Sequence, residues 1–406
     1  MSKKRNIIIV IILLLVTNIF TFSLTNLMTL RFNDKVVIPK GEYQYLMSVN
    51  DEFSKAMSIR DYVNKNYLRD VDNDALSEGI IKGMVQALDD PYSVYMTADE
   101  FASFTDQTAG IYGGIGVIVT PGDDNLITVV SPIEDTPGER AGIKTGDKII
   151  KVDGVEFYAE NMDQAVKVMK GKPKSTVNIT LMRKDKDNNN KTIDLDIVRE
   201  EIRLVTVKSG IIDNDMGYIK ITSFDEITYE DFKKHLTSLE KANVKGLILD
   251  VRNNPGGLLN ICADIADELL GEGDIVYTQT KDGEREYLKS NKKQNTLPLV
   301  MLVNEGSASA SEILAGAIKD HNRGELIGTT TFGKGIVQRI RDLTDGSGIK
   351  LTVSEYFTPN GTNIHGIGIA PDIVVELNED VENIGLEFLK EDNQLQKAIE
   401  VLRSKI

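Results

Sequence analysis

The 406-residue sequence contains one cysteine and three histidines. A lone cysteine, Cys262, cannot form an intramolecular disulfide, so disulfides say nothing about the redox compartment. Zinc sites of the cysteine–histidine type are excluded too, because His235, His321 and His365 lie far apart without paired ligand spacing. Cys262 lies in a helix-like pattern from Leu258 to Leu270, which predicts a buried structural thiol.

Positive charge is also scarce. The chain has 47 lysines and arginines against 62 aspartates and glutamates, giving a formal net charge of −15. Phosphate binding needs a basic face, so this balance argues against nucleic acid as a partner. The length allows two or three domains with at least one large core.

Long apolar runs are absent except at the N-terminus. Lys3-Lys4-Arg5 precede ten consecutive apolar residues, Ile7 to Val16, and a weaker apolar stretch continues to about Leu27. A basic flank before such a segment predicts a secretory signal or a single membrane anchor. Because there is no Ala-x-Ala-like cleavage site and no lipobox cysteine, we favour an uncleaved transmembrane anchor over residues 1–28. The body of the protein would then lie on the extracytoplasmic side of the cytoplasmic membrane.

The patterns that follow predict an α/β protein of several parts. Residues 29–97 form a small helical region, because apolar residues recur every four positions after the capping candidates Asp72 to Asp74. Residues 98–200 form a compact β-rich module with two helices. Strands and helices alternate over residues 201–378, which predicts a mixed sheet with packed helices. Residues 379–406 form an acidic, helical tail.

A glycine-rich loop, Gly113-Gly-Ile-Gly116, opens the β-rich module. It is no dinucleotide fingerprint, because it precedes a strand and opens no helix. Backbone N–H groups in such a turn can form a nest for a carboxylate, and the edge of the strand Val117 to Val119 could pair with an added peptide. An ordinary tight turn is the alternative interpretation.

A second glycine turn, Asp250-Val-Arg-Asn-Asn-Pro-Gly-Gly257, lies between a buried strand and a helix. α/β sheets place their ligands at the carboxyl ends of strands. The N–H groups of Gly256 and Gly257 would suit an oxyanion hole. A plain loop with good turn residues is the alternative.

A third segment carries serines at alternate positions: Ser307, Ser309 and Ser311. Ser309 would precede a helix from Ala310 to Lys319, whose amides and dipole stabilise an oxyanion. His321 would lie at the far end of this helix, roughly 15 Å away, and His365 looks like part of a turn. A histidine-based triad therefore has weak support.

A lysine is the other candidate base. Lys334 lies between two glycines, with Phe332 and Val337 close enough to desolvate its ammonium. Burial lowers the pKa of a lysine, and a neutral lysine can act as a general base. Gln338 lies four residues later and could hydrogen-bond the amine. A solvated surface lysine is the alternative.

Read together, these segments resemble the carboxy-terminal processing proteases, serine endopeptidases with a serine–lysine dyad and an inserted PDZ domain. The resemblance covers about Asp74 to Leu377, and its motifs occur in the family's order. The matching segments are Leu88-Asp-Asp-Pro-Tyr-Ser93, Gly113 to Val117, Ala141-Gly-Ile-Lys-Thr-Gly-Asp147, Asp250 to Gly257, Ser307 to Glu312, Thr331 to Gln338, Thr358-Pro-Asn-Gly361 and Gly366 to Asp372.

The resemblance implies an α/β protease core with an inserted PDZ domain at 98–200. The implied nucleophile is Ser309, its base is Lys334, and Gln338 orients the lysine. The oxyanion donors would be the backbone N–H of Ala310 and of a glycine in the Gly256-Gly257 turn. The PDZ carboxylate loop would comprise four residues: Gly114, Ile115, Gly116 and Val117. Asp320 matches a position at which some members carry an aspartate implicated in activity.

The predicted enzyme needs no metal or organic cofactor. Its substrates would be proteins or peptides bound by their carboxy-termini, it would contact the membrane through the anchor, and a homodimer stays open. Two alternatives remain. A PDZ-bearing scaffold with an inactive protease fold would bind tail peptides without cleaving them. An acyl-CoA enzyme on a related fold would bind CoA at the Gly256-Gly257 turn.

Overall fold

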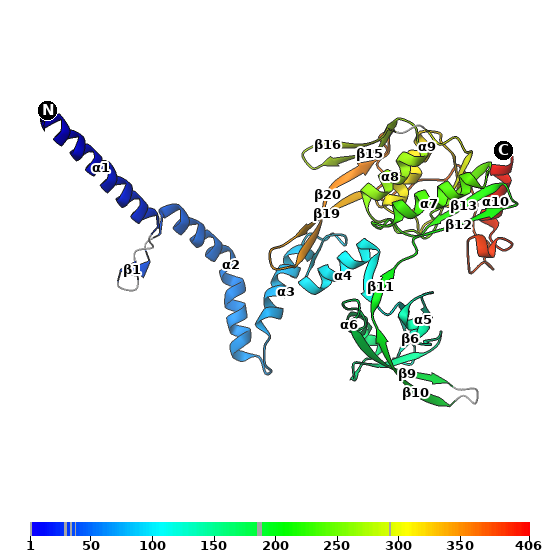
Figure 1. Ribbon diagram of the computed structural model, residues 1–406, viewed down its shortest axis with the longest axis horizontal. Helices are drawn as coiled ribbons and strands as arrows, with labels where there is room; N and C mark the ends of the chain where they lie inside the picture. Colours follow the sequence, from blue (N-terminus) through cyan, green and yellow to red (C-terminus); the bar gives the residue numbers. More distant parts are fainter. Residues whose placement is uncertain (1, 28–30, 33–34, 37, 185–188, 292–293) are drawn as a thin grey trace. The chain divides into compact units, whose positions relative to one another are not determined.

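The computed structural model describes residues 2–27, 31–32, 35–36, 38–184, 189–291 and 294–406. The chain divides into two compact units, Met1–Met84 and Val85–Ile406, which we describe separately (Figure 1).

The first unit is mainly helical. α1 (Ser2–Leu27) and α2 (Lys40–Asn66) precede and follow a short hairpin of β1 (Arg31–Phe32) and β2 (Lys35–Val36). α3 (Asn73–Gln86) begins where the Asp72 carboxylate accepts hydrogen bonds from the N–H groups of Asp74 and Ala75, as its capping pattern predicts. The predicted membrane-spanning segment has no support, because no helix among the described residues is long and apolar enough to cross a bilayer.

The second unit opens with elements that lead into the β-rich module. They are β3 (Val94–Met96), α4 (Ala98–Ala109) and β4 (Ile111–Gly114). The chain leaves the module through β11 (Glu200–Arg203), which pairs antiparallel with β4. The entering and leaving strands are thus bonded side by side.

The β-rich module contains a sheet of order β10-β9-β7-β6-β5, with β8 paired to β7. Its strands are β5 (Val117–Pro121), β6 (Ile127–Pro132), β7 (Lys148–Val152), β8 (Val155–Glu156), β9 (Thr176–Lys184) and β10 (Asn190–Val198). Its helical elements are α5 (Pro137–Arg140), η1 (Ala159–Asn161) and α6 (Met162–Met169). Alternating apolar residues of β9 (Val177, Ile179 and Leu181) lie in its core. β9 and β10 pair antiparallel as a hairpin, and residues 185–188 between them lie outside the described residues.

The remaining core centres on a six-stranded sheet of order β12-β13-β14-β17-β18-β21. Only β12 runs antiparallel to its neighbour among these described strands. The strands are β12 (Val207–Ile212), β13 (Met216–Ile221), β14 (Gly246–Asp250), β17 (Leu299–Val303), β18 (Glu325–Gly328) and β21 (Ile373–Val374). The parallel strands alternate with helices, as the sequence predicts.

Helices cover both faces of this sheet (Figure 1). One face packs against α7 (Thr228–Lys241), α8 (Leu259–Leu269) and α9 (Ala310–Asp320). The other face packs against α10 (Asn393–Arg403), which follows the short η2 (Leu386–Phe388). Within β14 the two faces separate cleanly, since Leu247 and Leu249 face the first set and Ile248 faces α10.

A second sheet was not expected from the sequence. It has the order β16-β15-β20-β19, with β3 paired to β20. Its strands are β15 (Gly273–Thr280), β16 (Arg285–Ser290), β19 (Ile336–Asp342) and β20 (Gly348–Phe357). β19 and β20 pair antiparallel over most of their length. The sheet brings β3, from before the β-rich module, next to the segment that follows Lys334.

Candidate active site

The predicted catalytic residues line one cleft of about 590 Å³ in the second unit. Its walls include all six residues that the sequence assigned to catalysis or to the oxyanion hole: Gly256, Gly257, Ser309, Ala310, Lys334 and Gln338. Apolar side chains form much of the rest, among them Phe224, Ile313 and Tyr356. The structure thus brings together three segments that lie far apart in the sequence.

Ser309 lies directly before α9, in a backbone conformation that few residues adopt. Its φ and ψ are 55° and −114°, so a non-glycine residue occupies the left-handed side of φ space. Such strain persists only where the surroundings hold it, and it is common at functional sites. One restraint is the buried Tyr356 hydroxyl, which donates to the Ser309 carbonyl over 3.1 Å.

Glu312, in the first turn of α9, joins the Ser309 and Lys334 segments. Its carboxylate has no solvent exposure. One oxygen accepts the N–H groups of Ser309 (2.9 Å) and Lys334 (2.8 Å). The other accepts the Gly333 N–H (2.7 Å) and the Thr331 hydroxyl (2.6 Å). These bonds to one anion fix the backbones of both residues relative to each other.

Glu312 is not among the site residues predicted from the sequence. A signal was nevertheless present, because a glutamate three residues after a helix-capping serine has the spacing of a capping box. Here the carboxylate accepts the Ser309 N–H in that manner, and the same group reaches the lysine loop.

Lys334 is half-buried in the loop before β19. Burial lowers the pKa of its ammonium, and the nearby Lys350 adds to that effect, while Asp90 and Glu312 oppose it. The Lys334 Nζ lies 4.4 Å from the centroid of the Tyr92 ring, a cation–π geometry. In the part of the chain that the structure describes, no hydrogen bond joins this amine to the Ser309 hydroxyl.

Gln338 lines the cleft, and no hydrogen bond joins it to Lys334 in the described structure. Its Nε2 donates to the Thr352 hydroxyl, with a long separation of 3.4 Å. The register of β19 against β20 shifts between Val337 and Gln338. Lys334 precedes the strand and Gln338 follows this irregularity, so the simple period of a strand does not relate the two side chains.

The glycine turn lies against the Ser309 backbone. A Cβ on Gly256 would lie 2.7 Å from the Ala308 carbonyl oxygen and 2.8 Å from the Ser309 Cβ, so only glycine fits. The Gly256 N–H donates to the Asn254 side chain over 2.9 Å and is already engaged. This narrows the predicted oxyanion donors to Gly257 and Ala310, whose N–H groups have no acceptor among the described residues.

The flanking serines have structural contacts instead. Ser307 and Ser311 are fully buried. The Ser307 hydroxyl donates to the Val251 carbonyl (2.9 Å), and the Ser311 hydroxyl donates to the Asn254 carbonyl (2.9 Å). Both hydroxyls therefore join the serine segment to the glycine turn.

No histidine lines the cleft in the described structure. His235 bonds Ser209, His321 bonds the Asp274 carbonyl at the far end of α9, and His365 lies exposed in a turn. Asp320, the last residue of α9, accepts the Asn360 N–H and also lies outside the cleft. Cys262 is buried as predicted, and its thiol bonds the Ala310 carbonyl.

The predicted carboxylate loop lies between β4 and β5. The Ile115 carbonyl accepts the Gly138 N–H (2.6 Å), and the Gly116 carbonyl accepts the Thr136 hydroxyl (3.0 Å). Gly116 has a φ of 73°, and a Cβ there would collide with Thr136. The strand that begins at Val117, β5, lies at the edge of its sheet. Among the described strands it pairs only with β6, which leaves its other side open to a peptide.

Comparisons with known proteins agree with this architecture. The family model for peptidase family S41 matches residues 215–375, a PDZ domain model matches 113–197, and the model for the activating protease CtpB N-terminal domain matches 14–100.

Individual relatives span most of the chain. The carboxy-terminal processing protease CtpA of Bacillus subtilis is 41% identical over 330 residues, which cover 81% of this chain and 70% of that protein. The carboxy-terminal-processing protease of Bartonella bacilliformis is 39% identical over 345 residues, covering 83% and 76%. Among solved structures, a photosystem II D1 C-terminal processing protease is 32% identical with a TM-score of 0.48, covering 80% of this chain and 89% of that one.

Proposed function

The chain belongs to the carboxy-terminal processing proteases of peptidase family S41, and from that premise we propose that Ser309 is its nucleophile and Lys334 its general base. The protein is a serine peptidase with a PDZ domain, and it binds peptide or protein substrates. This assignment favours a peptidase over both the inactive scaffold and the acyl-CoA enzyme. The observation that carries the residue assignment is the single cleft into which Ser309, Lys334 and the glycine turn converge.

The reaction proceeds through an acyl-enzyme. The Ser309 Oγ attacks the scissile carbonyl carbon while its proton passes to the neutral Lys334 amine. The carbonyl oxygen becomes an oxyanion, which accepts hydrogen bonds from the N–H groups of Gly257 and Ala310. Collapse of this intermediate breaks the C–N bond, and the Lys334 ammonium returns the proton to the leaving amine. Water then attacks the ester carbon while its proton passes to Lys334. The ester C–O bond breaks, and the Lys334 ammonium returns the proton to the Ser309 Oγ.

Burial prepares Lys334 for this role. Its lowered pKa raises the fraction of neutral amine near neutral pH, which a base requires. The amine rests over the Tyr92 ring, so it has to turn from the ring toward Ser309 when a substrate fills the cleft. Catalytic hydrogen bonds often tighten only once substrate is bound.

We assign substrate capture to the carboxylate loop, residues Gly114 to Val117. The terminal carboxylate of a substrate accepts N–H groups of the loop, and the substrate tail pairs with the free edge of β5. The edge position of β5 supports this assignment. Gln338 is assigned to the wall of the cleft that it shares with Lys334.

The residue assignment is tested by cleavage of a peptide with a free carboxy-terminus. Ser309→Ala and Lys334→Ala should each abolish turnover while the protein remains folded by circular dichroism. Ser311→Ala is the matched control, because it removes a hydroxyl two residues away and should keep more activity than Ser309→Ala. Full turnover by either dyad variant would refute the assignment.

We propose separately that the protease body lies on the extracytoplasmic side of the cytoplasmic membrane. Its support is the basic flank and apolar run at the N-terminus. Added protease should degrade the body in intact spheroplasts, and protection from digestion would contradict the proposal. The predicted homodimer stays a prediction, which light scattering of the purified protein would check.

A further inference from the structure

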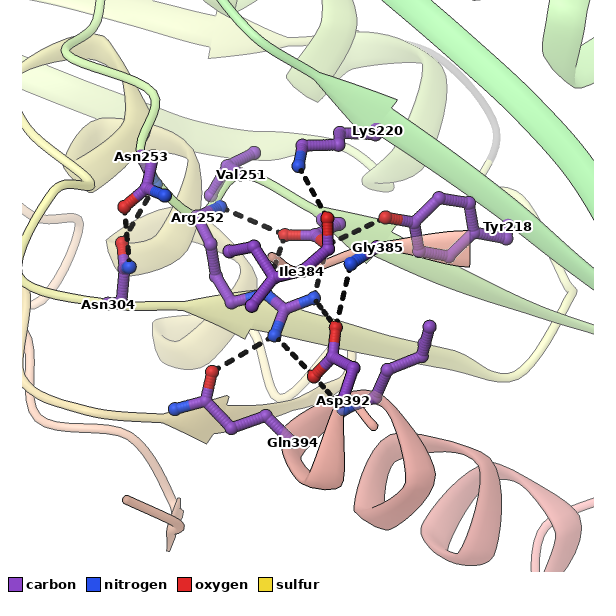
Figure 2. A network of polar contacts seen from close by, with 12 residues as sticks. Tyr218, Lys220, Val251, Arg252, Asn253, Asn304, Ile384, Gly385, Asp392 and Gln394 are labelled. Carbon is purple, nitrogen blue, oxygen red and sulfur yellow. Dashed lines mark hydrogen bonds and ion pairs between the residues drawn. The ribbon is translucent and has the colours of Figure 1, made fainter. Parts of the chain in front are cut away.

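A buried ion network connects the C-terminal tail to the glycine turn (Figure 2). Its centre is Arg252, which follows β14 and whose side chain has no solvent exposure. The Arg252 Nη2 lies 2.6 Å from the Asp250 carboxylate and 2.7 Å from the Asp392 carboxylate. Asp392 precedes α10 and is separated from Arg252 by 140 positions in the chain.

All three nitrogens of the Arg252 guanidinium donate hydrogen bonds. Nε bonds Asp250 (3.0 Å), Nη1 bonds Asp392 (2.9 Å) and Gln394 (3.0 Å), and Nη2 bonds both carboxylates. Two bonds to Asp392 form the parallel arrangement that fixes both distance and direction. Three of the five donors in the fork thus depend on residues of the tail.

The carboxylates of Asp250 and Asp392 also accept hydrogen bonds from groups other than the guanidinium. Asp250 accepts the Tyr218 hydroxyl (2.7 Å) and the Arg252 N–H (3.0 Å). Asp392 accepts the N–H groups of Gly385 (2.8 Å) and Leu395 (3.0 Å), the second of which caps α10. Every donor of the guanidinium is paired in this buried network, so loss of one acceptor would leave a buried donor unsatisfied and favour a rearrangement.

Arg252 lies near the start of the glycine turn, four residues before Gly256. The neighbouring Asn253 exchanges hydrogen bonds with Asn304 (2.8 and 2.7 Å), as Figure 2 shows. Asn254 then accepts the Ala308 N–H through its carbonyl (3.0 Å). A continuous series of bonds therefore connects the tail to the turn and the turn to the serine segment.

We propose that Asp392 is a positioning residue for peptide hydrolysis. Its carboxylate accepts two hydrogen bonds from the guanidinium of Arg252, whose charge it shares with Asp250, and so orients that group. The oriented Arg252 fixes the start of the turn whose Gly257 N–H donates to the oxyanion. Asp392 acts through Arg252 and the backbone and does not line the cleft. The inference rests on the proposed roles of Gly257 and Ser309.

Attachment of the tail alone does not explain this arrangement. α10 has its own apolar anchor, because Leu395, Ala398 and Leu402 are completely buried against the sheet. The ion network instead converges on the residue at the beginning of the turn. A displacement of about 1 Å in catalytic geometry can reduce turnover about 100-fold, so loss of the Asp392 charge should affect catalysis more than docking.

Asp392→Asn in the full chain is the test. Asparagine keeps the size of the side chain and its ability to cap α10, but it removes one anion from the network. We expect kcat to fall about 10- to 100-fold with KM within about twofold. A peptide boronate that mimics the tetrahedral intermediate should lose affinity in parallel with kcat, because it depends on the same oxyanion donors. Asp392→Glu, which restores the charge, should recover part of the loss.

Leu402→Ala is the matched control. It weakens the apolar docking of α10 and leaves every partner of Arg252 in place. At a temperature at which both variants are folded, Leu402→Ala should keep its kcat even if it lowers the unfolding midpoint as much as Asp392→Asn does. An unchanged kcat in Asp392→Asn, or an equal loss in Leu402→Ala, would overturn the inference. Failure of the proposed function would appear separately, as turnover by Ser309→Ala.

Discussion

Replacement of Glu312 by glutamine should weaken the hydrogen bonds that connect the Ser309 segment to the Lys334 loop. The side chains of Ser309 and Lys334 themselves stay unchanged. The wild-type carboxylate accepts bonds from Ser309, Lys334, Gly333 and Thr331 at 2.6–2.9 Å. In Glu312→Gln one of the two oxygens becomes an NH2 group, which repels the donors that face it. The acceptor that remains is also neutral.

The geometry decides which oxygen is replaced. If the NH2 group faced the N–H groups of Ser309 and Lys334, two backbone donors would be left unsatisfied. Facing Gly333 and Thr331 is less unfavourable, because the Thr331 hydroxyl can rotate and accept. One charged hydrogen bond, worth about 1.5–3 kcal/mol, is then lost and the others weaken. We therefore expect a loss of about 2–4 kcal/mol in the free energy of unfolding. The loss stays in this range because a neutral amide is easier to bury than a carboxylate, which offsets part of the lost hydrogen bonding.

Urea unfolding and peptide cleavage measure the two effects. The unfolding midpoint should fall, and kcat should fall about tenfold or more because the backbones of Ser309 and Lys334 are held less firmly. The control is Glu305→Gln in the loop before α9, an exposed glutamate that bonds only the Thr329 hydroxyl among its described contacts. It should change the free energy of unfolding by less than about 0.5 kcal/mol.

The pH profile gives an independent readout. The Glu312 charge raises the pKa of Lys334, so its removal lowers that pKa. The base works as the neutral amine, and kcat/KM therefore rises as pH passes through the pKa of Lys334. The ascending limb should move to lower pH in Glu312→Gln. The proposed role of Glu312 would be refuted if Glu312→Gln kept the stability and kcat of the wild type. An ascending limb of kcat/KM at higher pH than in the wild type would refute it too.

Three further predictions concern the same machinery. Lys350→Gln removes a cation that lowers the pKa of Lys334, so the ascending limb of kcat/KM should move to higher pH; a shift to lower pH would be inconsistent. Gly256→Ala places a Cβ 2.8 Å from that of Ser309 and should reduce kcat at least tenfold in cleavage assays, with near-normal activity contradicting the tight contact. A peptide substrate with an amidated carboxy-terminus should bind the PDZ module at least tenfold more weakly by calorimetry, whereas equal affinity would exclude carboxylate recognition by Gly116 and its neighbours.

The residues that line the cleft lie in short local motifs, which is why the sequence alone could single them out. A glycine pair after a buried strand, a serine before a helix and a lysine between glycines each have a local physical reason. The parallel strands and their helices were equally visible, since buried strands form continuous apolar runs. The confirmed elements around Ser309 are all of this local kind.

Long-range pairing was not visible in the sequence. The Arg252–Asp392 contact spans 140 positions, and the acidic tail gave no sign that one of its carboxylates is buried. The second sheet was missed for the same reason. β15 pairs with β20, about 80 residues later by their bounds, and strand periodicity does not identify a partner.

Gln338 shows a different limit. The four-residue spacing from Lys334 suggested a shared face, but that argument assumes a regular element between them. The register irregularity before Gln338 and the loop that carries Lys334 both break the period. Local spacing predicts side-chain direction only where the backbone is regular.

The serine–lysine dyad is tested most directly by identifying the covalent acyl-enzyme. Wild-type protein is mixed with a peptide substrate, quenched in acid within the first turnover and digested for mass spectrometry. The mass of the acyl fragment should be found on Ser309, and it should be missing in Ser309→Ala and in Lys334→Ala. An acyl group on another residue, or undiminished cleavage by Ser309→Ala, would contradict the assignment of Ser309 and Lys334.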